Sequence, residues 1–162
     1  MDFEEIRRRF KPAKIRILVV GESPPPSKGF FYDVNTPETQ LPRNTRLAFG
    51  DKLGRVEFLD IFRREGFYLV DLFSGRKRTV KNATSFEKEV AVARLIDYIQ
   101  NADPEYLVSV LKRIDPLVRY ARDKSGAHVE YRCLRFPTRQ FIITYRHEFK
   151  QILTELGITR TI

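Results

Sequence analysis

The sequence is poor in the residues on which metal and cofactor sites most often depend. Its 162 residues include one cysteine, Cys133, one methionine, two histidines and no tryptophan. A single cysteine excludes an intrachain disulfide and a multi-cysteine zinc or iron–sulfur site. Neither His128 nor His147 has a second histidine, cysteine or aspartate at the spacing of a metal ligand. We therefore expect no metal ion, no iron–sulfur cluster and no other cofactor.

Long apolar segments and the common nucleotide-loop motifs are missing as well. The sequence has no run of eighteen apolar residues, and its first ten residues, MDFEEIRRRF, contain charges of both signs. Neither a membrane span nor a secretory signal is therefore expected. We predict a cytoplasmic protein without a membrane partner. The patterns GxxxxGK(S/T) and GxGxxG do not occur, which argues against P-loop and dinucleotide-binding proteins.

The sequence has fewer acidic residues than basic residues. Thirty lysine and arginine residues oppose 21 aspartate and glutamate residues, which gives a net charge of +9 and an isoelectric point near 9.8. A basic excess of this size on one domain favours partners that carry phosphate, and nucleic acid first among them. The high charged fraction of 31%, with one cysteine and one methionine, also fits the composition of heat-adapted proteins.

Apolar runs alternate with helical patterns along the chain. Residues 15–21 have no polar face, which is typical of a strand buried on both sides of a parallel sheet. Helical segments separate successive strands, and this spacing predicts parallel pairing through right-handed crossovers. We expect residues 1–162 to form a single α/β domain, with three layers (α/β/α) around a four-stranded parallel β-sheet. The predicted strands are residues 15–21, 67–73, 106–111 and 128–134, and the predicted helices are residues 3–10, 45–49, 55–64, 85–101, 115–122 and 139–156.

The end of the first strand is the strongest candidate for a functional site. Gly21, Glu22 and Ser23 follow the apolar run, and three prolines that begin at Pro24 prevent both a helix and a continued strand. Ligands of open α/β sheets bind beyond the carboxyl ends of the strands. A glycine, a carboxylate and a hydroxyl at such an end therefore indicate a ligand site. Three aromatic residues come soon after the prolines: Phe30, Phe31 and Tyr32.

The second strand also ends in residues that suit a ligand site. Asp71 is the one charged residue of an otherwise apolar run, so its carboxylate is either paired at the rim of the core or presented to a ligand. The first two strands are expected to be neighbours, which would bring Asp71 close to Glu22. A basic loop follows the second strand and contains Arg76, Lys77, Arg78 and Lys81.

The segment LVVGESPP, with GFFY after it, resembles the first motif of the uracil-DNA glycosylase superfamily. The iron–sulfur branch of that superfamily has a glutamate after the glycine, as Glu22 follows Gly21 here. The resemblance implies a four-stranded parallel sheet and hydrolysis of the N-glycosidic bond of a base that is flipped out of DNA. It also implies that Phe30 or Phe31 stacks on the flipped base, and that Asp71 lies where the residue that reads the base edge is found.

The same resemblance extends to the segment before the last helix and shows departures from the family. Phe136, Pro137 and Thr138 would correspond to the HPS motif. The histidine that supports the departing base in many members is then replaced by Phe136. The asparagine of the uracil-cleaving branches is replaced by Asp71, and the cluster-binding cysteines are absent. The chain resembles a divergent branch rather than an ordinary uracil glycosylase.

The residues themselves can be assigned roles in such a reaction. Hydrolysis of an N-glycosidic bond needs a carboxylate that orients water or stabilises a cationic sugar, a wall that stacks the base, and cations for the flanking phosphates. We hypothesise that Glu22 positions the water. An ionised Asp71 accepts hydrogen bonds, so it would favour a base with an exocyclic amine. The remaining candidates are Gly21, Ser23, Pro24, Phe30, Phe31, Tyr32, Phe136 and Thr138 for the substrate, and Arg76, Lys77, Arg78, Lys81 and Arg139 for the DNA backbone.

The sequence leaves other interpretations open. The chain could be a non-catalytic nucleic-acid-binding module of the same fold, or a small nucleotide or nucleoside hydrolase that uses the same crevice. Each feature also has a purely structural interpretation. The GESPPP segment could simply terminate a strand, and the aromatic run could belong to the core. Asp71 could cap a loop, and the basic loop could be a solvated surface.

Overall fold

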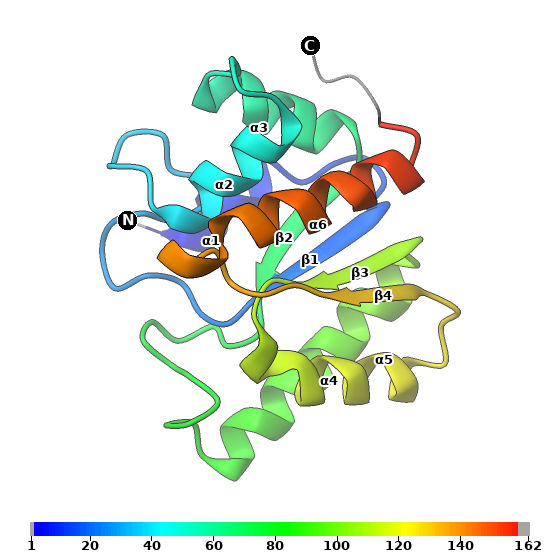
Figure 1. Ribbon diagram of the computed structural model, residues 1–162. Helices are drawn as coiled ribbons and strands as arrows, with labels where there is room; N and C mark the ends of the chain where they lie inside the picture. Colours follow the sequence, from blue (N-terminus) through cyan, green and yellow to red (C-terminus); the bar gives the residue numbers. More distant parts are fainter. Residues whose placement is uncertain (1, 159–162) are drawn as a thin grey trace.

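Four parallel strands form the centre of the structure, a computed structural model that describes residues 2–158. The strands are β1 (Ile17–Gly21), β2 (Phe67–Asp71), β3 (Tyr106–Ser109) and β4 (Glu130–Cys133), and their spatial order is β2-β1-β3-β4 (Figure 1). Strand β1 pairs in register with β2 on one side and with β3 on the other. The predicted parallel sheet is confirmed, and so is the expectation that the first two strands are neighbours.

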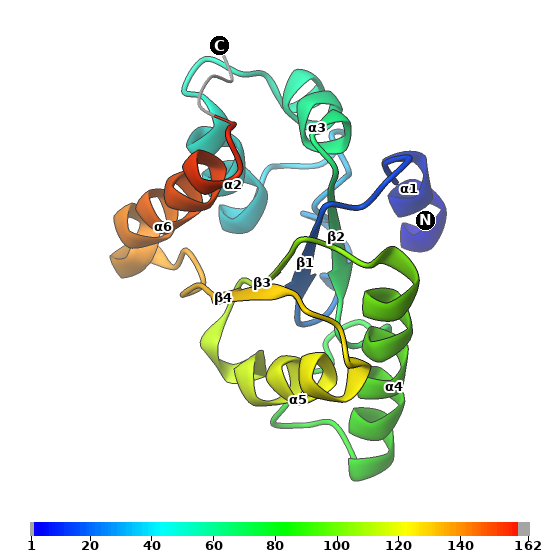
Figure 2. The same cartoon turned by 90° about the vertical axis from the view of Figure 1, so that its right-hand side faces the viewer.

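Helices cover both faces of this sheet. The chain crosses from β1 to β2 in one direction and from β2 through β3 to β4 in the other, so right-handed crossovers place the connecting helices on opposite faces. Figures 1 and 2 show α2, α3 and α6 on one face, α4 and α5 on the other, and α1 beside the outer edge of β2. The three-layer α/β/α architecture is therefore confirmed. The helices are α1 (Phe3–Arg9), α2 (Gln40–Phe49), α3 (Arg55–Arg64), α4 (Ser85–Ala102), α5 (Asp115–Ser125) and α6 (Ile142–Glu155), with 3₁₀ turns η1 (Lys112–Ile114) and η2 (Arg139–Phe141).

Local sequence signals explain where several helices begin and end. The Asp2 carboxylate accepts from the backbone N–H of Glu4 at 3.0 Å and caps α1, and the Thr84 hydroxyl accepts from Glu87 at 3.1 Å and caps α4. Gly126, with φ of 70°, ends α5 in the left-handed region that glycine favours. Within the described residues, no helix is long and apolar enough to cross a membrane.

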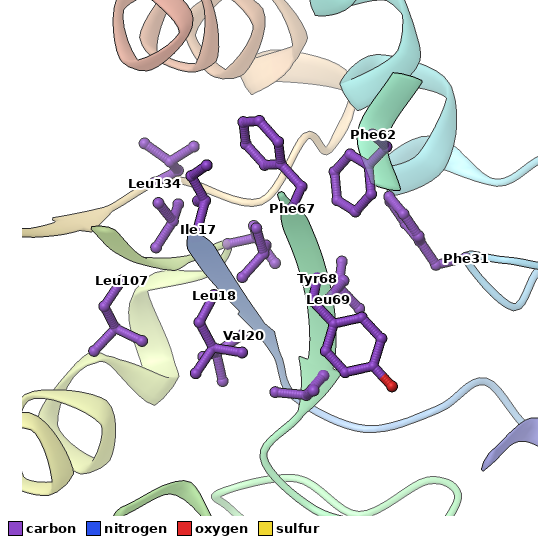
Figure 3. Packing of buried hydrophobic residues seen from close by; sticks show 14 of the residues in the cluster. Ile17, Leu18, Val20, Phe31, Phe62, Phe67, Tyr68, Leu69, Leu107 and Leu134 are labelled. Carbon is purple, nitrogen blue, oxygen red and sulfur yellow. The ribbon is translucent and has the colours of Figure 1, made fainter. Parts of the chain in front are cut away.

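The core lies on both sides of the sheet. All five residues of β1 and all five of β2 are buried, because helices cover both faces. On the face of α2, α3 and α6, aromatic rings pack against one another with centroids 5.0 to 6.0 Å apart. Figure 3 shows part of this packing around β1 and β2. The rings on this face include Phe49, Phe58, Phe62, Phe67 and Phe149.

Element boundaries differ from the predictions at a few places. Helix α2 begins at Gln40, five residues before the predicted start, and includes Pro42. Proline is tolerated in the first turn of a helix because the N–H groups there have no partner within the helix. The last helix is divided into the 3₁₀ turn η2 and the α-helix α6. The predicted strands extend one or two residues beyond the observed ladders, at the amino ends of β1 and β4 and at the carboxyl ends of β2, β3 and β4.

Candidate functional site

An open cavity of about 620 Å³ lies beyond the carboxyl ends of the strands. Residues that follow each of the four strands line it, because all four strands are parallel and end at the same edge of the sheet. Strands β1 and β3 are neighbours whose onward connections lie on opposite faces of the sheet (Figure 2). Such a switch point is where open α/β sheets bind ligands, and the volume lies in the range of small-molecule sites.

The cavity brings together much of the site predicted from the sequence. The first motif contributes Gly21, Glu22, Ser23 and Pro24 to its wall. Strand β2 contributes Asp71 at its carboxyl end, and the segments after β2 and β4 contribute three further predicted residues, Lys77, Phe136 and Thr138. Gly21 and Asp71 are paired across β1 and β2. Residues far apart in the sequence therefore meet at one edge of the sheet.

Glu22 is buried and fully engaged by hydrogen-bond donors. Its Oε1 and Oε2 accept from Nε of Arg113, at 2.9 Å each, and Oε1 also accepts from Nη2 of the same guanidinium. The backbone N–H of Val80 donates to Oε2 at 3.1 Å. Burying a carboxylate is costly unless it is paired and hydrogen-bonded, and Arg113 meets both needs. Glu22 therefore stands at the cavity wall in a fixed orientation.

Asp71 is the second buried carboxylate of the cavity. Its Oδ2 accepts from Nη2 of Arg7 at 2.5 Å, and its backbone oxygen accepts from Nη2 of Arg94 at 2.5 Å. Burial raises the pKa of Asp71 to about 6, although the guanidiniums of Arg7 and Arg94 act in the opposite direction. Asp71 therefore changes its charge near pH 6, and pKa values shifted in this way are common at functional sites.

Gly21 makes room for this carboxylate, so Gly21→Ala is expected to destabilise the protein by about 1–3 kcal/mol. A Cβ atom at position 21 would lie 2.9 Å from Oδ1 of Asp71, and Arg7 holds the other oxygen of that carboxylate. Urea unfolding measures the change. Gly54→Ala is the control, because a Cβ there meets no atom within 4 Å. A Gly21→Ala protein as stable as the wild type would contradict the tight fit.

The three aromatic residues after the prolines belong to the core and do not line the cavity. Phe30, Phe31 and Tyr32 are at most 6% exposed. Phe30 stacks on Phe3 of α1 with a centroid distance of 4.3 Å, and Phe31 packs against Phe62 of α3 at 5.2 Å (Figure 3). The expected stacking of a base on Phe30 or Phe31 is therefore corrected, because α1 and α3 already cover these rings.

Tyr32 has a structural partner of its own. Its hydroxyl accepts from the backbone N–H of Leu69 at 2.6 Å and donates to the backbone oxygen of the same residue at 3.1 Å. Leu69 lies in β2, at the edge of the sheet, so Tyr32 satisfies backbone groups that no strand pairs. The prediction that Tyr32 binds the substrate is therefore wrong, and the residue instead stabilises the edge of β2.

The predicted basic loop is only partly directed at the cavity. Lys77 lines the cavity, with a backbone φ of 63°. Arg76 lies over the ring of Phe3 at 4.3 Å, and its Nη1 donates to the backbone oxygen of Pro26 at 3.0 Å. Arg78 pairs with Glu87 on the surface. Arg78 and two further predicted phosphate ligands, Lys81 and Arg139, are exposed but do not form part of the cavity wall.

Several residues of the cavity wall were missed by the sequence analysis. Lys112 and Arg113 follow β3, Arg135 follows β4, and Phe141 ends the 3₁₀ turn η2. The first pair could have been found, because it comes directly after a predicted parallel strand and such strands end at the same edge. The same signal applies to Arg135, which directly follows the predicted strand 128–134, whereas Phe141 carries no comparable signal. The half-buried rings of Phe136 and Phe141 are the aromatic surfaces of the cavity.

Two further searches, for metal-binding groups and for similar proteins, give no result for this site. Residues 2–158 contain no group of three or more histidine, cysteine, aspartate or glutamate side chains that could hold a metal ion. A scan against models of protein families and a search of curated proteins both find no match to the chain.

Proposed function

We propose that the protein is a DNA glycosylase-like enzyme that takes a base out of DNA and hydrolyses its N-glycosidic bond in the cavity. The observation that carries the proposal is the joint burial of Glu22 and Asp71 at the ends of neighbouring strands, in one cavity with aromatic and cationic walls. An enzyme that acts on a base must remove it from the helical stack and hold it in a pocket. The basic excess of the chain suits a DNA substrate.

Glu22 supplies the carboxylate that the reaction requires. Water forms a bond to C1′ of the sugar, the bond from C1′ to the base nitrogen breaks, and the base leaves with the electron pair and takes up a proton. A carboxylate beside the sugar orients the water, accepts its proton and stabilises positive charge on the sugar ring. The free base and an abasic sugar are the products. The donors from Arg113 and Val80 fix Glu22 in one orientation, as positioning of the water requires.

Phe136 and Phe141 are proposed to stack on the flipped base, the role that the sequence analysis predicted for Phe30 or Phe31. Both rings are half-buried and line the cavity, so each has a face for the base to stack on. Phe136 occupies the position where the resembling family carries a histidine that supports the departing base. Release of the base would then depend less on a donor at this position and more on the base's own protonation.

Asp71 is proposed to read the edge of the base. Arg7 binds its Oδ2, which leaves Oδ1 for the ligand. With a pKa of about 6, the carboxylate is mostly ionised at pH 7.5 and accepts hydrogen bonds, so it favours an exocyclic amine over a carbonyl. A cytosine or adenine derivative is therefore the expected substrate.

A base-release assay over a panel of oligonucleotides tests this function. We expect modified cytosine or alkylated adenine to be released about 10 to 100 times faster than uracil or hypoxanthine at pH 7.5, since one good edge contact contributes about 1–3 kcal/mol. Single-stranded and double-stranded forms of each oligonucleotide are compared. Release of uracil alone would contradict the role of Asp71. Release of no base from any substrate would contradict the glycosylase activity itself.

The second candidate is a nucleic-acid-binding module without catalysis. The engagement of both Glu22 oxygens by Arg113 and Val80 favours it, because a carboxylate occupied in this way has less capacity for water. Such a module would bind oligonucleotides with an affinity that falls steeply with salt and would release no base. The same panel, followed by binding assays at several salt concentrations, therefore separates the two candidates.

A further inference from the structure

Arg113 is the exposed partner of a buried carboxylate. Its side chain is 62% exposed, whereas that of Glu22 is 7% exposed. Glu22 takes Nε and one N–H of Nη2, and Nη1 has no hydrogen-bond partner among residues 2–158. A guanidinium has five N–H donors in a rigid fork. Arg113 is thus fixed on one side and retains donors that point away from the core.

The cavity carries more positive charge than its own carboxylates need. Four cations line it, Lys77, Lys112, Arg113 and Arg135, against the two carboxylates Glu22 and Asp71. Both carboxylates already have a guanidinium, since Arg113 binds Glu22 and Arg7, which lies outside the wall, binds Asp71. The ion pairs of residues 2–158 include no carboxylate partner for Lys77, Lys112 or Arg135, although Nζ of Lys112 donates to the backbone oxygen of Cys133 at 2.5 Å. The wall therefore has a net positive charge, which favours an anionic ligand.

Arg135 is exposed, and its guanidinium packs against an aromatic ring. Its guanidinium lies 4.8 Å from the centroid of Phe141, in a cation–π contact. Arg113 follows β3 and Arg135 follows β4, so the two reach the cavity from adjacent loops. Arginine binds phosphate through two parallel hydrogen bonds. Holding both side chains in advance lowers the entropy lost when the ligand binds.

We infer that Arg113, positioned by Glu22, and Arg135, positioned by Phe141, bind a nucleotide phosphate at the mouth of the cavity. The inference rests on the proposed function only in that a nucleotide enters this cavity, and it does not require that a bond be cleaved. Glu22 is then also a positioning residue for Arg113. The phosphate belongs to a DNA strand in the proposed reaction, and to a free nucleotide if the protein is a nucleotide hydrolase.

Binding measurements on Arg113 variants test the inference with two probes. The first is a single-stranded oligonucleotide with a stable abasic analogue, and the second is a deoxynucleoside monophosphate. Arg113→Ala is expected to weaken oligonucleotide binding about 10-fold to 100-fold, as for the loss of a charged hydrogen bond, and to reduce the salt slope by about 0.7 per lost phosphate contact. Arg119→Ala is the matched control, because Arg119 is 60% exposed and paired with Asp115 but lies outside the cavity.

Two further variants separate positioning from folding. Arg113→Lys keeps a cation for Glu22 and is expected to keep the thermal stability while it still weakens binding, because lysine lacks the planar fork. Glu22→Gln is expected to weaken binding as well, and to add nothing to Arg113→Ala in the double variant. If Arg113→Ala loses affinity for the deoxynucleoside monophosphate but not for the oligonucleotide, the phosphate site is supported and the DNA substrate is contradicted. Wild-type affinity of Arg113→Ala for both probes would overturn the inference, whatever the base-release assay shows.

Discussion

Glu22→Gln is expected to slow base release by a factor of about 10² to 10⁴, the usual contribution of a catalytic acid or base. The amide keeps the size of the side chain but cannot accept a proton from water or stabilise a cationic sugar. Single-turnover assays with protein in excess measure the rate of the chemical step. Saturating protein also compensates for weaker DNA binding. The expected loss of affinity when Glu22 no longer positions Arg113 therefore does not change this rate.

Glu38→Gln is the matched control for this experiment. Glu38 is also largely buried and is held by an arginine, with Nε and Nη2 of Arg46 at 2.9 and 2.8 Å from its two oxygens, but it does not line the cavity. The control should release base at the wild-type rate. A Glu22→Gln protein with the wild-type single-turnover rate would show that Glu22 takes no part in the chemistry.

Arg7→Leu is expected to lower the free energy of unfolding by about 3–5 kcal/mol at pH 8. Arg7 and Asp71 are both buried, and removal of one partner from a buried pair leaves the other charge without compensation. Arg9→Leu is the control on the same helix, because Arg9 pairs with Glu5 at 2.9 Å on the surface. Exposed pairs contribute about 0–1 kcal/mol. Urea unfolding of the two variants measures the difference.

The pH dependence of this effect follows from the pKa of Asp71. In the unfolded chain the group titrates near 3.9, and in the fold its pKa is raised to about 6. Between these values the native state binds more protons, so the stability of the wild-type protein falls as the pH rises, by about 3 kcal/mol in all from this group. Without Arg7 the native pKa rises further, and the loss continues above pH 6. The effect of Arg7→Leu should therefore be larger at pH 8 than at pH 5.

Asp71→Asn isolates the contribution of this one carboxyl group. The amide does not titrate, so the variant should lose the part of the pH dependence that lies between pH 4 and pH 6. Stabilities of the wild type and the variant are compared over that range. If the two curves stay parallel, another group accounts for the slope.

The fold could be predicted because its strands are apolar on both faces. Runs such as residues 15–21 contain no polar alternation, and only a sheet covered on both sides buries such a run. The parallel arrangement then predicts that Glu22 and Asp71 lie at one edge of the sheet. Boundaries were less accurate, since propensity does not determine where a ladder or a first helical turn begins.

The candidate site could be predicted only in part, because its main contacts join distant parts of the chain. Arg113 and Glu22 are 91 residues apart in the sequence, and Arg7 and Asp71 are 64 residues apart. No local pattern indicates such pairs. The aromatic run was ambiguous for the same reason, since Phe30 is buried by Phe3 and Phe31 by Phe62. Whether a ring faces a ligand or the core depends on elements elsewhere in the chain.

The hydroxyl of Tyr32 also bears on how copies of the protein meet one another. An open sheet edge can recruit a strand from another molecule, and this is a common start of aggregation. On the β2 side, Tyr32 already occupies the N–H and C=O of Leu69, so an incoming strand would find those groups taken. The opposite edge, β4, carries the charged side chains of Glu130 and Arg132. The Tyr32 hydroxyl thus occupies part of one sheet edge, and charged side chains flank the other, and both features disfavour the pairing of strands from two copies of the protein.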